Sequence, residues 1–418
     1  MSNVLIIGTG GRESAFAYAL KKSPKLTTLF ASPGSDGLAE VATIVPKMNG
    51  RECAAFCKAS NIDLVIFGGE AELVDGQSDD LRAVGISVLG CSKAAAALEG
   101  SKDFLKSVLF DAGVPCAASQ SFTDETQALA YLATRSIPIV LKTDGLAGGK
   151  GVVICEDRAD AEQWVRDYIS GAAFGDAGKC VVIEDFMTGP EISFFVLVDA
   201  DGNAHPLAAS RDHKRIYDSD KGPNTGGMGA FTPVPEFTAE LQANVMRDII
   251  EPSLAEMQKR GTPFSGFLFA GLMLTADGPK LLEYNVRMGD PETQVVLAAL
   301  DCDLLELLSD SANGTATTPN ADTNTVRINV VLAADGYPET PKKGAEISGL
   351  EILTAGIDYF HAGTKRDGDK WLVNGGRVMN VLGEGANIDD ARIDAYAKIE
   401  KIKFAGMQFR MDIGKTEN

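Results

Sequence analysis

The chain has 418 residues, 45% of them hydrophobic and 23% charged, and its formal net charge is -19. This composition is that of a folded protein and excludes a disordered chain. A surface this acidic repels nucleic acid and anionic membranes, so we expect neither as a partner.

The N-terminus and the cysteines indicate a cytoplasmic protein. The opening run MSNVLIIGTGG lacks a basic segment, and no apolar run approaches the roughly 18 residues of a membrane span. Seven scattered cysteines do not form a disulfide framework, and we expect Cys53 and Cys57 to be buried on one helix face. The length predicts two to four domains.

Residues 1–101 are predicted to form an N-terminal α/β domain. Short apolar runs at 3–7, 26–31, 64–67 and 86–89 read as strands, and residues 12–22 and 51–60 as helices. Strands that alternate with helices in this way predict a parallel sheet.

Residues 102–324 are predicted to form a two-lobed centre, followed by a small C-terminal domain over 325–418. The smaller α+β lobe, about 118–188, has predicted strands at 137–142, 151–155 and 180–185 and a helix at 160–170. The larger lobe has strands at 194–198, 267–274 and 279–285 in an antiparallel sheet, covered by helices at 236–260 and 293–308. Polar residues 311–324 read as a linker, and 326–333 as the start of the C-terminal module.

The first candidate site is the loop after the first strand, formed by Gly10, Gly11, Arg12 and Glu13. Glu13 stands where a dinucleotide fingerprint would need glycine. A glycine loop at a helix N-terminus still favours a phosphate or carboxylate, although a tight turn without a ligand remains the alternative. Pro33 and Gly34 follow the second strand at the same edge of the sheet.

The second candidate is the glycine-rich segment at 142–152. Two lysines, Lys142 and Lys150, bracket it, and its glycines are Gly145, Gly148, Gly149 and Gly151. Glycine lets backbone fold over oxygen atoms without Cβ clashes, so we expect a lid that closes on a triphosphate. A flexible hairpin in solvent is the alternative.

Two further segments carry weaker signals. The apolar strand that ends in Glu184, Asp185 and Phe186, with Glu191 after it, can pair with an adenine edge and a ribose, yet alone it reads as ordinary strand and turn. The ionisable run at 210–215 beside the glycine-rich 222–230 suits an anionic substrate pocket or, equally, a solvated face.

The last candidate is the strand that carries Glu283, Asn285 and Arg287, which alternate onto one face. Two oxygen ligands suit Mg²⁺, which takes few protein ligands beside phosphate oxygens and water. The arginine can grip a carboxylate or a transferring phosphoryl group. The alternative is a strand with a solvated outer face.

Taken in order, these segments resemble the ATP-grasp superfamily and, within it, the glycinamide ribonucleotide synthetase family. The resemblance covers the whole chain. It rests on GGRE (10–13), LEGSK (98–102), KTDGLAGGKGV (142–152), DHKR (212–215), GPNTGGMGA (222–230), GFLFAGLM (266–273), RMGDPETQ (287–294) and NGGRV (374–378). Ser14, Gly69, Gly148 and Met288 depart from the family pattern, which leaves details of the pocket and lid open but not the reaction class.

The resemblance implies the following roles. Lys102 and Lys142 would hold ATP phosphates, residues 145–151 would be the lid, and Glu184 to Phe186, with Glu191, would bind adenine and ribose. Glu283 and Asn285 would ligate Mg²⁺ or Mn²⁺. Asp212 and Arg287 would serve glycine, while the loop from Gly10 to Glu13 and Lys214 would serve phosphoribosylamine; Arg287, Asp212 and Lys214 are the expected catalytic residues.

The implied reaction joins glycine to 5-phosphoribosylamine at the expense of ATP, through glycyl phosphate, and gives glycinamide ribonucleotide, ADP and phosphate. Two alternatives stay open: an ATP-grasp ligase with another acid and amine, or a non-catalytic nucleotide-binding protein on this scaffold. We expect small molecules as the only partners and a monomer, with a dimer as the alternative.

Overall fold

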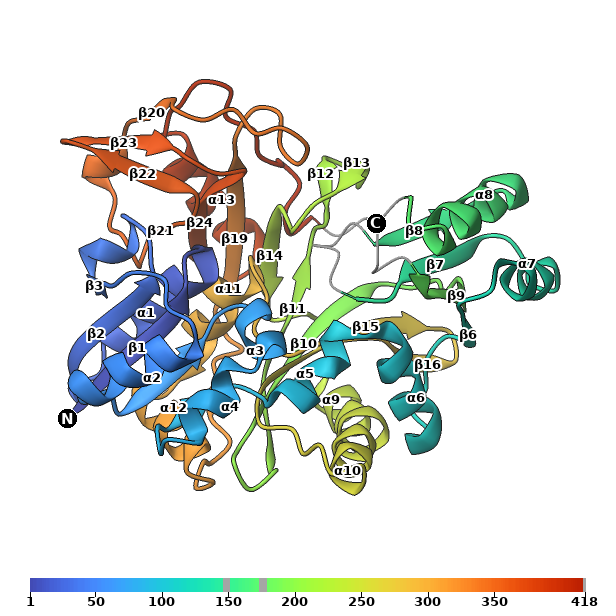
Figure 1. Ribbon diagram of the computed structural model, residues 1–418. Helices are drawn as coiled ribbons and strands as arrows, with labels where there is room; N and C mark the ends of the chain where they lie inside the picture. The colour runs from blue at the N-terminus through green and yellow to red at the C-terminus, as the bar shows by residue number, and fades with distance from the viewer. Residues whose placement is uncertain (146–150, 173–178, 416–418) are drawn as a thin grey trace.

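A computed structural model describes residues 1–145, 151–172 and 179–415 of the chain (Figure 1). Among these residues, none of the helices combines the length and the apolar character that a membrane span needs.

The N-terminal domain is built on a parallel sheet with the strand order β3-β2-β1-β4-β5. Its strands are β1 (Ser2–Gly8), β2 (Leu26–Pro33), β3 (Thr43–Ile44), β4 (Leu64–Phe67) and β5 (Val88–Leu89). Its helices are α1 (Gly11–Lys21), α2 (Gly50–Ala59), α3 (Ala71–Asp75), α4 (Gln77–Arg82) and α5 (Lys93–Gly100). The predicted parallel sheet is confirmed.

Strand alternation gives this sheet two separate cores. In β1, Val4 and Ile6 face the core that holds Phe16 of α1, whereas Leu5 faces the core that holds Cys53 of α2. Because both faces are covered, the strands are apolar throughout, as parallel strands usually are.

The small lobe is a four-stranded antiparallel sheet with the order β6-β9-β7-β8. Its strands are β6 (Ser119–Phe122), β7 (Ile139–Thr143), β8 (Val152–Cys155) and β9 (Val181–Asp185), packed against α7 (Glu125–Ala133) and α8 (Arg158–Ile169). Figure 1 shows this lobe projecting from the rest of the molecule.

The large sheet has eight antiparallel strands in the order β16-β15-β10-β11-β14-β19-β24-β21. Their bounds are β16 (Gly278–Asn285), β15 (Gly266–Thr275), β10 (Glu191–Val198), β11 (Ala204–Asp212), β14 (Gly229–Thr232), β19 (Val326–Ala333), β24 (Arg377–Gly385) and β21 (Tyr359–His361). The main strands of the C-terminal part extend the central sheet, because β19 pairs with β14.

Helices pack on both faces of this sheet, and seven short strands form small separate sheets. The helices are α6 (Lys102–Ala112), α9 (Ala239–Val245), a π-helical turn (Met246–Ile250), α10 (Glu251–Lys259), α11 (Glu292–Ala299), α12 (Leu304–Ala312) and α13 (Ile388–Ile399). The short strands are β12 (Arg215–Tyr217), β13 (Lys221–Asn224), β17 (Leu300–Asp301), β18 (Asn320–Ala321), β20 (Glu346–Ile347), β22 (Thr364–Asp367) and β23 (Lys370–Val373).

Two predicted helices differ from the structure. The single helix predicted over 293–308 is wrong, because β17 interrupts it and Asp303 then caps a new helix by accepting a hydrogen bond from the Glu306 N–H. The helix predicted over 236–260 begins later, at Ala239 after the cap Thr238, and contains the π-helical turn. The predicted linker is also shorter than 311–324, since α12 runs to 312 and β18 pairs with β17.

Candidate active site

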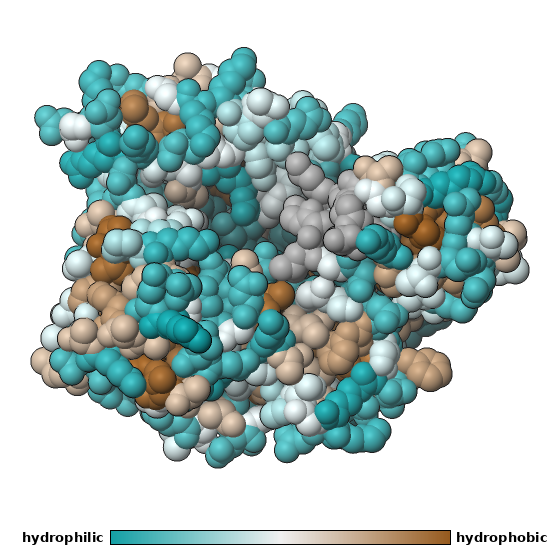
Figure 2. Space-filling model, viewed as in Figure 1, coloured by the Kyte–Doolittle hydropathy of each residue, from teal (hydrophilic) through white to brown (hydrophobic). Residues whose placement is uncertain are grey.

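The candidate site lies where α6, β7 and β16 meet, and it holds Lys102, Lys142 and Glu283. Nζ of Lys102 lies 3.5 Å from Oε2 of Glu283. Nζ of Lys142 donates to the carbonyl of Leu282, the neighbour of Glu283, over 3.3 Å. Figure 2 shows a hollow beside the grey atoms, with hydrophilic residues on its visible walls. Residues remote in sequence are thus brought together at one place.

Glu283 is an ionised carboxylate surrounded by cations. Burial opposes its ionisation, but the positive charges of Lys102, Lys142, Lys214 and Arg287 outweigh burial and hold its pKa at about 2. Its side chain keeps 35% of its surface accessible, so a ligand can reach it.

Glu283 and Asn285 form an oxygen donor set that fits a hard divalent cation. They lie two residues apart on β16, and Oδ1 of Asn285 accepts a hydrogen bond of 3.0 Å from Nη2 of Arg287. Among the described residues no three His, Cys, Asp or Glu side chains gather into a metal-binding group. A cation at this site would therefore complete its shell with ligand oxygens and water, as Mg²⁺ commonly does.

Arg287 is held by acidic residues that the sequence analysis did not single out. Its Nε lies 3.1 Å from Glu70 and its Nη2 lies 3.0 Å from Glu99, while Nη1 donates to the Met288 carbonyl. Glu99 also accepts from the Val286 N–H at 2.8 Å, which fixes the backbone of the same strand end. Burial raises the pKa of Glu99 although Arg287 opposes this. The guanidinium is thus oriented before any ligand arrives.

The strand predicted to face adenine carries three side chains in different settings. Glu184 is buried between two lysines: Lys106 lies 3.1 Å from Oε1, and Lys142 lies 3.0 Å from Oε2. Asp185 is paired with Arg135, at 2.9 Å from its Nε. Phe186 is 38% exposed.

The ionisable run on β11 meets the start of α11. Lys214 pairs with Glu191, and although burial opposes its charge, Asp212 and Glu191 raise the pKa of Lys214. Burial, the largest influence, raises the pKa of Asp212, and Lys214 counteracts it. Glu292, which lies in the RMGDPETQ motif but was assigned no role from the sequence, is buried and accepts from Ser193 Oγ at 3.3 Å. Burial and the charge of Asp212 raise the pKa of Glu292 to about 7.

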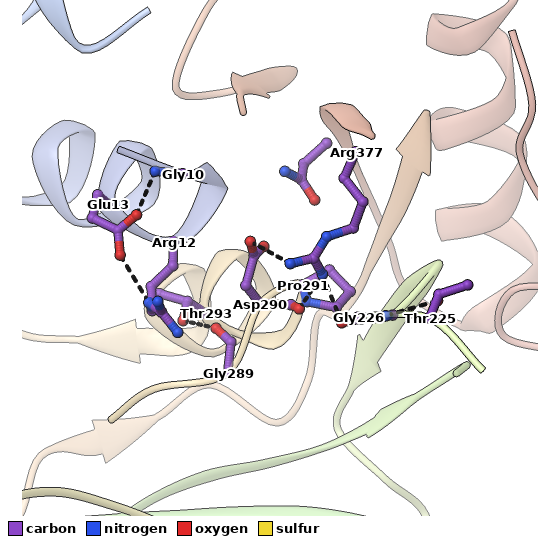
Figure 3. A network of polar contacts seen from close by, with 12 residues as sticks. Gly10, Arg12, Glu13, Thr225, Gly226, Gly289, Asp290, Pro291, Thr293 and Arg377 are labelled. Atoms are coloured by element: carbon purple, nitrogen blue, oxygen red, sulfur yellow. Dashed lines mark hydrogen bonds and ion pairs between the residues drawn. The ribbon is translucent and has the colours of Figure 1, made fainter. Parts of the chain in front are cut away.

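The first glycine loop is filled by its own glutamate. Glu13 is 3% exposed, accepts a hydrogen bond from the Gly10 N–H and pairs with Nε of Arg12 at 2.9 Å (Figure 3). Arg12 also donates to the Met288 carbonyl at 2.8 Å. A Cβ on Gly11 would lie 2.4 Å from Nδ2 of Asn380, so a larger residue there would displace this side chain from the C-terminal part. The helix N-terminus is therefore already supplied with a carboxylate.

A second contact network ties Gly226 and the start of α11 to the C-terminal part. Arg377 donates to the carbonyls of Gly226 and Asp290, and its Nη2 lies 3.1 Å from the Asp290 carboxylate (Figure 3). Thr293 Oγ1 donates to the Gly289 carbonyl at the start of α11. Arg377 comes from the NGGRV motif, and its partners come from the GPNTGGMGA and RMGDPETQ motifs. The sequence therefore marked these segments but not the contacts between them.

The remaining predicted residues have varied positions. Pro33 is the register partner of Gly8, so it and Gly34 lie at the carboxyl edge of the parallel sheet, as predicted. Gly145 has a φ of +103°, which favours glycine. Gly151 accepts a backbone hydrogen bond from Thr143 at 2.8 Å. Gly148, Gly149 and Lys150 lie outside the described residues.

Two other hollows do not compete with this site. One of about 330 Å³ lies between Asp201 and α10, and one of about 390 Å³ lies beside Trp371. Neither lining contains a group of lysines, whereas the candidate site combines several cations with an oxygen donor pair. That combination can neutralise a polyphosphate chain beside a divalent cation.

Three family models match consecutive parts of the chain. They are the N domain (residues 2–99), the ATP-grasp (A) domain (100–293) and the C domain (327–416) of phosphoribosylglycinamide synthetase.

Similar proteins agree with these matches. A phosphoribosylamine–glycine ligase of Mesorhizobium japonicum is 47% identical over 99% of this chain and 97% of its own length. One of Neisseria meningitidis is 44% identical over 98% of both. The crystal structure of the Thermotoga maritima phosphoribosylamine–glycine ligase superposes with a TM-score of 0.86 at 33% identity, covering 98% of this chain and all of that one. A biotin carboxylase domain of Hydrogenobacter thermophilus, solved with MgADP, shares the fold alone, at a TM-score of 0.74 and 16% identity over 97% of this chain and 91% of that one.

Proposed function

This chain belongs to the phosphoribosylglycinamide synthetase family, and on that basis we propose that it joins glycine to 5-phosphoribosylamine at the expense of ATP. The products are glycinamide ribonucleotide, ADP and phosphate, in purine biosynthesis. The observation that carries this assignment beyond family membership is the convergence of Lys102, Lys142, Glu283 and Arg287 in one site.

In the first step, a carboxylate oxygen of glycine attacks the γ-phosphorus of ATP, ADP leaves, and glycyl phosphate forms. Lys102 and Lys142 are suited to neutralise the phosphates, because both point toward the same carboxylate-bearing strand. Arg287, fixed by Glu70 and Glu99, is suited to orient the glycine carboxylate without further ordering.

A divalent cation held by Glu283 and Asn285 would supply charge neutralisation at the transferring phosphoryl group. Mg²⁺ or Mn²⁺ is proposed because the donors are a carboxylate and an amide oxygen, which are hard ligands. The strongly lowered pKa keeps Glu283 ionised at neutral pH, so a proton would not compete with the cation for this carboxylate.

In the second step, the amine of phosphoribosylamine attacks the glycyl carbonyl, phosphate leaves, and the nitrogen loses a proton. Lys214 and the segment from Gly10 to Glu13 stay our candidates for the pocket of this substrate, and Asp212 for the glycine side. Residues 145–151 stay the candidate cover that excludes water from the acyl phosphate. No protein nucleophile is required.

The test is phosphate release from ATP with each substrate omitted in turn. Release that requires glycine, phosphoribosylamine and a divalent cation together is the expected result. If phosphate release depends on a different acid or amine, the enzyme ligates that pair of substrates instead. If the chain binds ADP but releases no phosphate in the full mixture, a non-catalytic role is favoured.

A further inference from the structure

Helix α6 carries a second lysine, Lys106, whose role the proposed reaction does not explain. Lys102 and Lys106 lie one helical turn apart, so their side chains leave the same face of α6. Lys102 approaches Glu283 on β16 of the large sheet, whereas Lys106 lies 3.1 Å from Glu184 on β9 of the small lobe. One helix therefore places a cation on each of the two sheets that bound the site.

Glu184 is clamped between Lys106 and Lys142. The two ammonium groups approach different carboxylate oxygens, at 3.1 Å and 3.0 Å. Lys142 and Glu184 are buried, with 7% and 3% of their side-chain surfaces exposed, and Lys106 keeps 10% exposed. In the part of the chain that the structure describes, Glu184 is the only carboxylate within ion-pair distance of Lys106.

The charge balance of this triad matters for anion binding. Two lysines and one glutamate leave one unit of positive charge, and Lys142 is the member that also reaches β16 at the Leu282 carbonyl. If Lys142 were the only partner of Glu184, their charges would cancel. Moving Lys142 toward a phosphate would then leave a buried carboxylate without a counterion, which is costly.

We propose that Lys106 is a positioning residue for nucleotide binding: it holds the Glu184 carboxylate and so keeps the charge of Lys142 available for phosphate oxygens. Lys106 itself stays with Glu184 on the side of the small lobe. This inference rests on the proposed function, in that it takes ATP as the nucleotide.

The experiment measures binding of ADP and of adenosine, with Mg²⁺ present, to the full chain by calorimetry or competition. Lys106→Met should weaken ADP binding tenfold or more and leave adenosine binding within about twofold, because adenosine has no phosphate for Lys142 to contact. Lys106→Arg, which keeps the charge, should bind ADP within about threefold of the unaltered chain. Lys58→Met, a change at an exposed lysine, is the control.

A double variant separates positioning from direct contact. In the background Glu184→Gln there is no carboxylate to hold, so adding Lys106→Met should change ADP affinity by less than threefold. A tenfold loss in that background would mean that Lys106 acts on the phosphates directly and would overturn the inference. This comparison also decides the matter if Lys106→Met alone does not fold.

Two other results would be decisive. Unchanged ADP binding by Lys106→Met, with the unaltered chain binding normally, overturns the inference and leaves the proposed function standing. If Lys106→Met weakens the binding of ADP and adenosine equally, the substitution has disrupted the whole site, and this result would also overturn the inference. Failure of the unaltered chain to bind ADP would overturn the proposed function and, with it, this inference.

Discussion

Nζ of Lys102 lies 3.5 Å from Oε2 of Glu283, although 181 residues separate the two in the chain. The contact joins the first turn of α6 to the end of β16, and Lys142 reaches the same strand from the small lobe through the Leu282 carbonyl. Three separate elements therefore bring together the groups that we propose for binding a metal-bound triphosphate.

Glu283→Gln should lower cation-dependent turnover at least about 100-fold, since loss of a ligand should cost no less than the roughly 10–100-fold of outer-shell changes. The amide keeps the shape but loses the charge that offsets Lys102 and Lys142. Phosphate release measured across a Mg²⁺ titration checks this, with the exposed Glu240→Gln as control. Normal turnover at ordinary Mg²⁺ would remove Glu283 from the metal site.

Arg287→Met should reduce the free energy of unfolding by about 3–5 kcal/mol, because it leaves the buried Glu99 without its cation. Adding Glu99→Gln should recover part of this stability. Glycine KM should stay raised in both variants if Arg287 binds the glycine carboxylate. Denaturant unfolding and glycine kinetics measure the two effects separately, and an unaltered glycine KM in both would rule out that binding role.

Gly271→Ala should fold normally yet lose activity, roughly tenfold or more. Gly271 is the register partner of Ser193 on one side and Glu283 on the other, so its face of the sheet is the face of the site. An added Cβ would lie 3.6 Å from Cγ of Glu283, an ordinary contact that strains nothing. A methyl group there would occupy space over the sheet beside Glu283, the proposed metal ligand. The melting temperature tests the expected normal folding, and kcat tests the expected loss of activity. Full activity would show that the substrates do not occupy this space.

Glu292 should make the stability of the protein depend on pH between about 4.5 and 7. Its pKa is raised to about 7 by burial and by Asp212, so the folded state binds a proton that the unfolded state releases. Its contribution is complete below pH 4.5 and is lost as pH rises through 7, a difference of about 3 kcal/mol.

Glu292→Gln, which stays neutral at every pH, provides the measurement. The melting temperature of this variant minus that of the unaltered chain should be near zero at pH 4.5 and should rise up to pH 8. A difference that does not change with pH would mean that Glu292 is ionised throughout.

Much of the fold followed from local patterns. The strand β4 over Leu64–Phe67 was predicted at its observed bounds, because a run of apolar residues and the turns around it are local features. The prediction failed at Asp303, where one capping side chain divides a pattern that otherwise reads as a single helix.

The sequence by itself determined which residues could do chemistry: strand alternation puts Glu283 and Asn285 on one face, and glycine loops mark where backbone must bend closely. Only the tertiary structure decided how those residues are held, with Arg287 between Glu70 and Glu99, Glu184 between Lys106 and Lys142, and β19 as an extension of the central sheet. The reason is that periodicity and capping act over a few residues along the chain, whereas an ion pair or a strand pairing depends on distances in space. Those distances are fixed only when separate elements pack together.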